Sequence, residues 1–380
     1  MAGGSIKRDG EGWMLVVDVA SQDGRRRPAR RRGFATKKAA EKELRSLLGL
    51  AEAGLYVEPM RLTLGRYLTE TWLPSIATRV RPTTGDMYRR IVDKHVVPSL
   101  GAVRIQVLDT PTISAFVSSL LQKGLSPKTV RNVHAVVSKA LADALDAGVV
   151  QRNAACAVKL PQVPKRAPRA WSAEQLGSFL EEIEADRLAA LWRFLALTGC
   201  RRGEALGLRW ADVDLKAGTA TLTNQRTIAG GSIVQGAPKT ASGARTVALD
   251  PVTVDTLREL RAVQNSERLL FGADWAKGDL VFTHPDGKGL WPQTVTRQFK
   301  EIAARLGLPL IGVHGLRHTA ATWMISQGVS PKLVAERLGH SNVSITLGLY
   351  THVMPAHDRA AAEAFAGALS KARGNSVTNL

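Results

Sequence analysis

The chain has 380 residues, and its 52 Lys and Arg against 33 Asp and Glu give a formal net charge of +19 at pH 7. An excess of this size attracts polyanions, and because only 5% of the residues are aromatic, duplex DNA is favoured over stacked single strands. The sequence has no signal peptide and no long apolar run, which argues against export and membrane insertion and favours a cytoplasmic protein.

The first 56 residues are expected to form a small β-sheet packed against one helix. Residues 13–20 alternate like a strand, residues 21–24 fit a turn, and residues 25–34 can return as a basic strand. Thr36 then caps a helix that runs to Leu50. A sheet of this kind can bind DNA in the major groove, although a basic tail that grips DNA non-specifically is the alternative. The candidate DNA-binding residues here are Arg25, Arg26, Arg27, Arg30, Arg31 and Arg32.

Residues 61–160 are predicted to form a domain of four or five helices. Pro82, Pro111 and Pro127 each stand where a helix begins, and Gly124 and Gly148 stand where helices end. Valine, leucine and alanine recur at helical spacing between Val130 and Ala144, which gives this segment one apolar face. Its polar side either contacts phosphates or is only solvated. The candidate phosphate-binding residues are Lys123, Lys128, Arg131 and Lys139.

Residues 161–169 read as a linker because the segment PQVPKRAP is rich in proline, basic and without apolar periodicity. Lys165 and Arg166 are candidate DNA contacts within it. Structure then restarts at a capping box formed by Ser172 and Gln175.

The second half is predicted to contain helices and one small sheet. A helix ends at Thr198-Gly199, and a short helix after Arg201 contains Glu204 and Leu208. Residues 218–250 alternate and turn like a three-stranded sheet, with Lys239 on the turn before its last strand. A lysine on a turn is usually only exposed, so Lys239 gains meaning from the motifs around it.

The stretch from Val313 to Val353 concentrates histidines between short apolar helices. Ser330-Pro331 marks a helix start, whereas Gly328 and Gly339 mark helix ends. We expect the intervening turns to present His314, Arg317, His340 and Tyr350 to a common site. Histidines can be purely structural or bind a metal, but these spacings match no common metal motif. An arginine among them would repel a cation and favours a phosphate.

Five motifs then occur in order. They are T-G-x-R at 198–201 with Glu204, P-K-T at 238–240, H-x-L-R-H at 314–318, L-G-H at 338–340, and L-Y-T-H at 349–352. Together they resemble the tyrosine recombinase, or phage-type integrase, family. The resemblance implies a catalytic domain at 170–370, a core-site-binding domain at 61–160 and an arm-site-binding domain at 1–56. The implied fold is α+β but mainly α, with a small antiparallel sheet in the catalytic domain.

The resemblance also implies a reaction in which Tyr350 attacks a DNA phosphodiester and remains attached to the 3′ end. Arg201 and Arg317 would neutralise the non-bridging oxygens, and Lys239 would protonate the departing 5′ oxygen. His314 would act as acid or base, and His340 would donate a hydrogen bond to the phosphate. Glu204 would orient Arg201, and His318 and His352 would support the site. No metal and no other cofactor is implied.

Two other classes share part of this pattern. A type IB topoisomerase would use the same groups but has no need of an arm-like domain. A non-catalytic DNA-binding regulator would have no reason to keep every catalytic group. Chromosome-dimer resolvases of this family normally lack a domain equivalent to residues 1–56. The resemblance therefore favours an integrase of a phage or mobile element.

The resemblance further implies a homotetramer on core-type and arm-type DNA sites. Residues Arg359–Leu369 form an amphipathic segment that we expect to dock on a neighbouring protomer. A DNA-bending host factor and an excisionase are additional partners that the resemblance leaves open.

Overall fold

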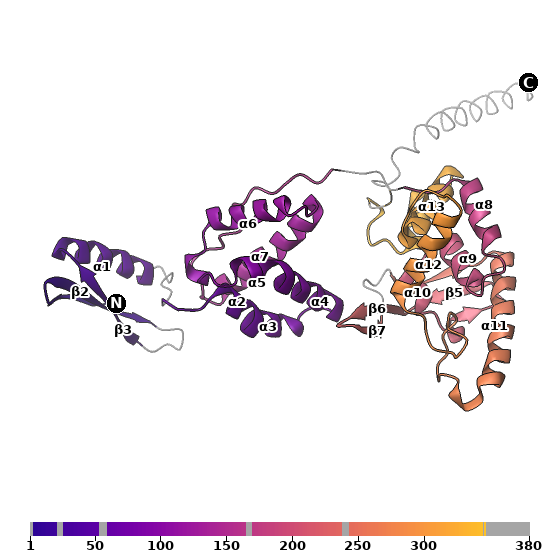
Figure 1. Ribbon diagram of the computed structural model, residues 1–380, viewed down its shortest axis with the longest axis horizontal. Helices are drawn as coiled ribbons and strands as arrows, with labels where there is room; N and C mark the ends of the chain where they lie inside the picture. The colour runs from indigo at the N-terminus through magenta and orange to yellow at the C-terminus, as the bar shows by residue number, and fades with distance from the viewer. Residues whose placement is uncertain are drawn as a thin grey trace, which may run out of the picture. The chain divides into compact units, whose positions relative to one another are not determined.

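The computed structural model describes residues 3–20, 26–52, 59–164, 169–237, 243–344 and 346. The chain divides into two compact units, Met1–Pro164 and Lys165–Leu380. Figure 1 labels many of their helices and strands. Within the described residues, no helix is long and apolar enough to cross a membrane. The finer division at 1–56, 61–160 and 170–370 stays a prediction.

The N-terminal part is a three-stranded antiparallel sheet covered by one helix. Its elements are β1 (Gly4–Asp9), β2 (Gly12–Ala20), β3 (Arg26–Phe34) and α1 (Lys37–Glu52). The central strand is β2, and its Leu15 and Val17 are fully buried with Leu47 of α1. Strand β1 was not predicted, because only one of its six residues, Ile6, is less than exposed and it therefore shows no apolar alternation.

The region 61–160, predicted to be helical, contains helices from Leu64 to Asp146. The elements are α2 (Leu64–Arg66), η1 (Tyr67–Trp72), α3 (Leu73–Ala77), α4 (Pro82–Ile91), η2 (Val92–Val96), α5 (Val97–Leu100), η3 (Ile105–Val107), α6 (Thr110–Gln122) and α7 (Pro127–Asp146). The hydroxyl of Ser126 accepts a hydrogen bond from the Thr129 amide, which caps α7. Valine and alanine residues along α7, among them Val130, Val133 and Ala140, are fully buried in this domain's core. The predicted apolar face is thus confirmed.

The second unit is mostly helical with short strands. Its elements are α8 (Ala173–Glu182), α9 (Ala189–Thr198), α10 (Arg202–Leu206), η4 (Trp210–Asp212), β4 (Val213–Asp214), β5 (Thr219–Leu222), β6 (Gln225–Ala229), β7 (Ser232–Gly236), β8 (Arg245–Ala248), α11 (Pro251–Phe271), η6 (Gly272–Asp274), α12 (Pro292–Arg305), α13 (Val313–Ser326) and α14 (Pro331–Leu338). The predicted capping box of Ser172 and Gln175 opens α8. An aromatic cluster joins α8, α9 and α12, with Phe179 and Phe299 ring centroids 5.4 Å apart.

The single three-stranded sheet predicted for residues 218–250 is wrong. The strand order is β4-β5-β8 in one sheet, and β6 pairs only with β7 in another. Ala220 of β5 lies opposite Val247 of β8, so this pairing joins residues on either side of the β6–β7 hairpin. Alternation identifies a strand but does not select its partner. The predicted short helix also ends at Leu206 rather than including Leu208.

Candidate active site

The turn that carries Arg201 depends on a glycine. Helix α9 ends at Gly199, whose φ of 63° is left-handed, a conformation that residues with a Cβ adopt at a cost. A Cβ at this position would also lie 2.6 Å from the Cδ2 of Leu338 and 3.2 Å from the Cβ of Ala320. Glycine therefore lets the chain turn from α9 to α10 in close contact with α13 and α14, and this turn places Arg201 at the N-cap of α10.

The Arg201 guanidinium is fixed from two sides. Its Nη1 donates to Glu204 Oε1 at 2.6 Å, and its Nη2 donates to the carbonyl oxygen of Gly339 at 3.1 Å. The second oxygen of Glu204 accepts a hydrogen bond of 2.9 Å from the Arg201 amide. Because 39% of the Arg201 side chain remains exposed, the anchored guanidinium can still contact a ligand.

Arg317 is a buried cation. Only 2% of the residue is exposed, and its Nη1 donates to the carbonyl oxygen of Gly199 at 3.0 Å. Its Nη2 is buried and has no hydrogen-bond partner among the described residues. Burial, together with the neighbouring Arg201, lowers the pKa of Arg317 to about 10, so the group remains charged at neutral pH. A buried cation with an unused donor favours an anionic ligand.

Two histidines lie within the field of these arginines. Burial lowers the pKa of His314 to about 4, with further contributions from His318, Arg317 and Arg201. The pKa of His340 also falls to about 4, because of burial and then because of Arg317 and Arg201. Both rings are therefore neutral at pH 7, so each has one nitrogen that donates and one that accepts.

Neighbouring groups orient both rings. The rings of His314 and His318 meet edge to face, with centroids 4.9 Å apart. The Nδ1 of His340 lies 2.8 Å from the Oγ1 of Thr346, which is completely buried. Burial lowers the pKa of His318, and the positive charge of Arg317 lowers it further.

Glu204 is a buried carboxylate between two arginines. It is 1% exposed, and its Oε2 accepts a hydrogen bond of 3.1 Å from Arg245 Nη2. Burial alone would raise the pKa of Glu204, but Arg245 and the bonds from Arg201 outweigh burial and hold the pKa below its usual range. Arg245 was missed by the sequence analysis, because a lone arginine at a strand's first residue is ordinarily exposed and belongs to none of the five motifs.

The structure thus brings together four of the six predicted catalytic residues, Arg201, His314, Arg317 and His340, with Glu204 and His318 beside them. Lys239, Tyr350 and His352 lie outside the described residues, as does the segment Arg359–Leu369. Within the part of the chain that is described, no group of three or more His, Cys, Asp and Glu side chains could hold a metal ion.

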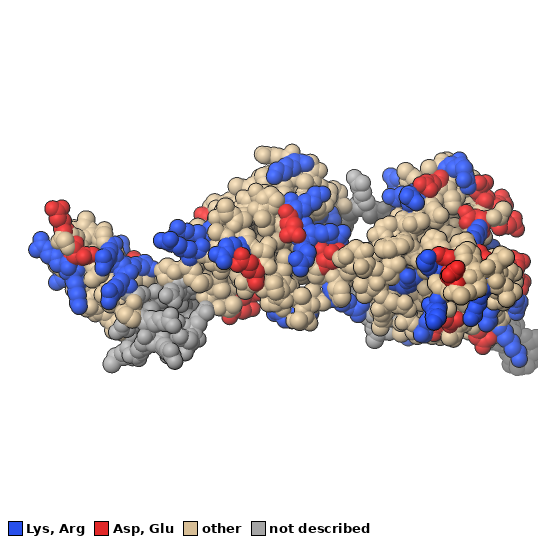
Figure 2. Space-filling view, turned by 60° about the horizontal axis from the view of Figure 1, so that its bottom comes forward, with Lys and Arg blue, Asp and Glu red and all other residues tan. Residues whose placement is uncertain are grey.

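The basic strand β3 presents its arginines on different faces. Arg31 lies opposite the buried Leu15, on the α1 side of the sheet, and donates to Glu43 of α1. Arg30 lies opposite Val16 and is exposed, and Arg32 is paired with Asp9 at 3.5 Å. Figure 2 shows basic side chains over much of the visible surface of this N-terminal part. Arg25 and the side chains of Arg26 and Arg27 lie outside the description.

The predicted basic residues of the helical domain are all exposed, but not all are equally available. Lys139 lies 3.7 Å from Asp143, and Arg131 donates to the carbonyl oxygen of Pro161 at 3.3 Å. Lys123 and Lys128 are exposed at the end of α6 and the start of α7. Lys165 and Arg166 of the linker lie outside the described residues.

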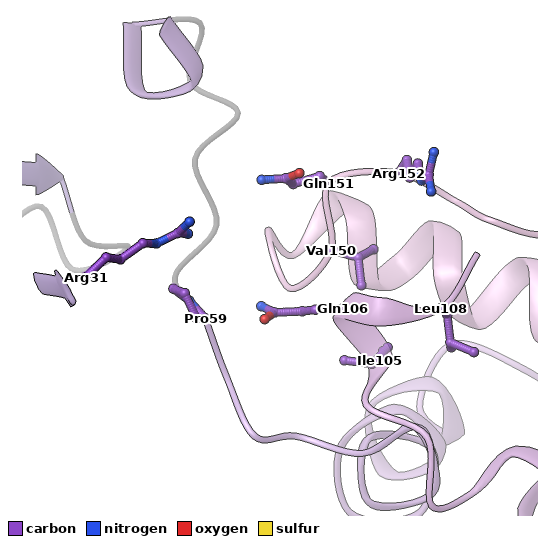
Figure 3. Close-up of a pocket in the computed structure, with 8 residues that line it drawn as sticks. All are labelled: Arg31, Pro59, Ile105, Gln106, Leu108, Val150, Gln151 and Arg152. Atoms are coloured by element: carbon purple, nitrogen blue, oxygen red, sulfur yellow. The ribbon is translucent and has the colours of Figure 1, made fainter. Parts of the chain in front are cut away.

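A hollow in the first unit is drawn in Figure 3. It is lined by Arg31, Pro59, Ile105, Gln106, Leu108, Val150, Gln151 and Arg152. Arg31 is the one lining residue among the predicted DNA contacts, and its guanidinium donates to Glu43 of α1, so we assign no role to this hollow.

Three segments of the chain match known protein families. Residues 170–357 match the phage integrase family, residues 5–49 an arm DNA-binding domain, and residues 65–121 the N-terminal SAM-like domain of phage integrases. A tyrosine recombinase XerC-like protein of Caldanaerobacter subterraneus subsp. tengcongensis is 30% identical, with 92% of this chain and 94% of that protein covered.

Solved structures show the same fold. The Tn1549 transposon integrase in complex with a circular intermediate DNA has a TM-score of 0.65 at 21% identity, covering 80% of this chain and 99% of that one. A lambda integrase tetramer bound to a Holliday junction has a TM-score of 0.58 at 15% identity, covering 91% and 94%. From these matches and the motifs, the chain belongs to the tyrosine recombinase, or phage integrase, family of site-specific recombinases.

Proposed function

We propose that this enzyme is the integrase of a phage or mobile element, and that it cuts and rejoins duplex DNA through a bond between Tyr350 and a 3′ phosphate. The observation that carries the proposal is the pair of anchored guanidiniums, Arg201 and Arg317. Backbone carbonyl oxygens of Gly339 and Gly199 fix one nitrogen of each, while Arg317 keeps a buried Nη2 without a partner among the described residues.

The two guanidiniums suit the charge that develops during phosphoryl transfer. As the Tyr350 oxygen bonds to phosphorus and the bond to the 5′ oxygen breaks, negative charge is spread over the non-bridging oxygens. Donors that are already oriented stabilise this charge without reorganising, because the protein has fixed them before the reaction. Arg201 and Arg317 then bind the two non-bridging oxygens, and the energy of the broken phosphodiester is retained in the tyrosyl phosphodiester for rejoining.

Proton transfers fall to the neighbouring groups. The phenol proton of Tyr350 leaves to a base, for which the neutral ring of His314 is suited. Lys239 donates the proton that the departing 5′ oxygen takes up. When the Thr346 hydroxyl donates to Nδ1 of His340, the ring proton is on Nε2, from which His340 donates to the phosphate.

Other nucleophiles in the described parts of the chain are poorly suited. Tyr67 is 3% exposed, and burial raises its pKa to about 12. Tyr88 stacks on Trp72, with ring centroids 5.5 Å apart. Cys200, next to Arg201, is buried and its pKa is raised to about 12, first by burial and then by Glu204. These environments support Tyr350 as the nucleophile.

The same proposal covers the partners. Residues 1–56 bind arm-type sites, residues 61–160 and 170–370 surround core-type sites, and four copies assemble on two duplexes. The match of residues 5–49 to an arm DNA-binding domain supports the first part. The net charge of +19 supports DNA as the ligand. A DNA-bending host factor and an excisionase belong to this proposal as accessory proteins that favour integration and excision, respectively.

Trapping on a nicked suicide substrate tests the proposed chemistry. The parent chain, Tyr350→Phe and the matched control Tyr88→Phe are incubated with site DNA in EDTA and without ATP. We expect a covalent protein–DNA band with the parent and with Tyr88→Phe, and no band with Tyr350→Phe. A band that persists in Tyr350→Phe contradicts the assignment of the nucleophile. Absence of a band with the parent, on DNA shown separately to be bound, would instead favour a non-catalytic regulator.

A further inference from the structure

Arg245 is a buried arginine that links three segments around the site. Its side chain is 8% exposed at the first residue of β8. The guanidinium donates to Glu204 Oε2 at 3.1 Å, to the carbonyl oxygen of Arg337 at 2.5 Å, and to the carbonyl oxygen of Gly243 at 3.0 Å. Every nitrogen of its guanidinium therefore has a protein partner, and the side chain is held within the protein with 8% of its surface exposed.

Two of these partners lead directly to Arg201. Glu204 accepts from Arg201 through its other oxygen, Oε1, at 2.6 Å. Arg337 stands two residues before Gly339, whose carbonyl oxygen is the second acceptor for the Arg201 guanidinium. Arg245 thus holds the side chain, and the end of the helix, that together fix the orientation of Arg201.

A reciprocal bond strengthens the second link. The Nη2 of Arg337 donates to the carbonyl oxygen of Ala248 at 3.0 Å, while Arg245 donates to the carbonyl oxygen of Arg337. Strand β8 and the C-terminal end of α14 are therefore tied at both ends of the strand. His340 follows Gly339 directly, so the same tie fixes the backbone from which His340 reaches the site.

Charge explains why an arginine is needed at this position. Glu204 is 1% exposed, and a buried carboxylate requires compensation by cations and hydrogen bonds. If Arg245 were absent, Arg201 alone would have to balance Glu204 and would be drawn toward it. Less of the Arg201 charge would then be available to a phosphate.

We propose that Arg245 is a positioning residue for DNA cleavage, holding Glu204 and the Leu338–His340 turn so that Arg201 faces the scissile phosphate. This inference rests on the proposed function. It assigns no contact with DNA to Arg245. Arg245 acts on the reaction through Arg201. Its effect is therefore measured by changing the charge on the non-bridging oxygens of the scissile phosphate.

The test compares two substrates that differ in the charge on the scissile phosphate. A methylphosphonate replaces one non-bridging oxygen by a methyl group, so the linkage is neutral and needs less compensation by arginine. Single-turnover cleavage is measured for the parent, Arg245→Met and Arg245→Lys. We expect Arg245→Met to slow cleavage of the phosphodiester about 100-fold but that of the methylphosphonate less than about tenfold. Arg245→Lys keeps the charge without the forked donors and should fall between the parent and Arg245→Met.

A matched arginine provides the structural control. Arg187 also pairs with a carboxylate, donating to Glu267 at 2.6 and 2.8 Å, and it donates to the carbonyl oxygen of Thr283. None of its partners contacts Arg201. Arg187→Met should therefore cleave both substrates at rates within about threefold of the parent. The thermal midpoint and the affinity for site DNA are recorded for every variant.

The outcomes separate the possible failures. If Arg245→Met slows both substrates by the same factor, or slows neither, the positioning role is overturned. If Arg245→Met does not fold, the ratio of the two rates in Arg245→Lys decides by the same criterion. If the parent forms no covalent complex on either substrate, the proposed function itself fails, and this result is distinct from any result that concerns Arg245 alone.

Discussion

The two units of the chain bury different kinds of side chain. Among the described residues of Met1–Pro164, His134 is the one buried polar side chain, and it lies 3.0 Å from the carbonyl oxygen of Ala155. The second unit buries charged groups, among them Glu204 and Arg317. The candidate DNA contacts of the helical domain are exposed instead. The buried charges of the second unit are held in fixed directions by neighbouring groups, whereas the candidate DNA contacts Lys123 and Lys128 are exposed to solvent.

This difference follows from the cost of desolvation. Burying a charge costs several kcal/mol of folding free energy unless opposite charges and hydrogen bonds compensate. A buried charge is therefore expected only where neighbouring groups provide that compensation. Glu204 has that support from Arg201 and Arg245. Arg317 is only partly compensated: its Nη1 donates to the carbonyl oxygen of Gly199, but its Nη2 has no hydrogen-bond partner within the described residues. Substitutions in the site should therefore change the rate of chemistry, and substitutions in the helical domain should change DNA affinity.

The largest effect is expected for Arg317→Gln. The amide can still donate to the carbonyl oxygen of Gly199, but the buried positive charge is lost, so cleavage should slow about 1000-fold. Affinity for site DNA should change less than about threefold, since one of many phosphate contacts is affected. Single-turnover cleavage and filter binding measure the two quantities. A loss of cleavage below tenfold would contradict the role of Arg317.

Gly199→Ala should destabilise the catalytic unit next most strongly, by about 3 kcal/mol. The left-handed backbone contributes about 1–2 kcal/mol, and the Cβ would overlap Leu338, which adds about 1–3 kcal/mol. Gly328→Ala is the matched control, because its φ is 79° but a Cβ there meets nothing within 4 Å. Urea unfolding compares the two. Equal destabilisation would show that the close packing against Leu338 is unimportant.

Acidification should lower the free energy of unfolding because of two histidines in the site, His314 and His340. Their pKa values are about 4 in the folded chain, whereas an unfolded histidine titrates near about 6.5. Between these values the unfolded state binds more protons, so stability is complete above about pH 6.5 and is lost as pH falls toward about 4. The free energy of unfolding should be lower at pH 5.0 than at pH 7.5, and His340→Gln should reduce this difference by about 1 kcal/mol, a value discounted for partial exposure. An unchanged difference in urea unfolding would contradict the lowered pKa of His340.

The smallest effect is expected in the helical domain. Lys128 is exposed at the start of α7, so Lys128→Gln should lower the salt dependence of DNA binding by about one unit of slope. Lys139 is already paired with Asp143 at 3.7 Å, and Lys139→Gln should lower the slope by less. Titrations at several salt concentrations measure both. A slope that changes more for Lys139→Gln than for Lys128→Gln would exclude this assignment.

Elements and site differ in how far the sequence predicts them. Helix ends were predictable because Ser126, Ser172, Gly199 and Gly339 act locally, through caps and left-handed turns. The motifs T-G-x-R and H-x-L-R-H also predict Arg201 and Arg317 as site residues from the sequence alone. Strand pairing was mispredicted, because β5 and β8 meet across 22 intervening residues (223–244) and alternation does not encode a partner.

The burial and the contacts of Arg245 could not be predicted from the sequence. Its burial and its bonds to Glu204 and Arg337 arise only when α10, α14 and β8 come together. A single charged residue at the start of a strand has no local pattern that distinguishes a buried group from an exposed one. The sequence thus identifies the groups proposed to touch the phosphate, and only the structure identifies the group that holds them.

Mass spectrometry of the trapped protein–DNA complex tests the assignment of Tyr350 most directly. After nuclease and trypsin digestion, the peptide Leu338–Arg359 should carry the mass of a nucleotide phosphate, with fragmentation placing it on Tyr350. The chain has four tyrosines, and the others are Tyr56, Tyr67 and Tyr88. A nucleotide on one of those three, or on a serine or cysteine, would contradict the proposed nucleophile and the site built around Arg201 and Arg317.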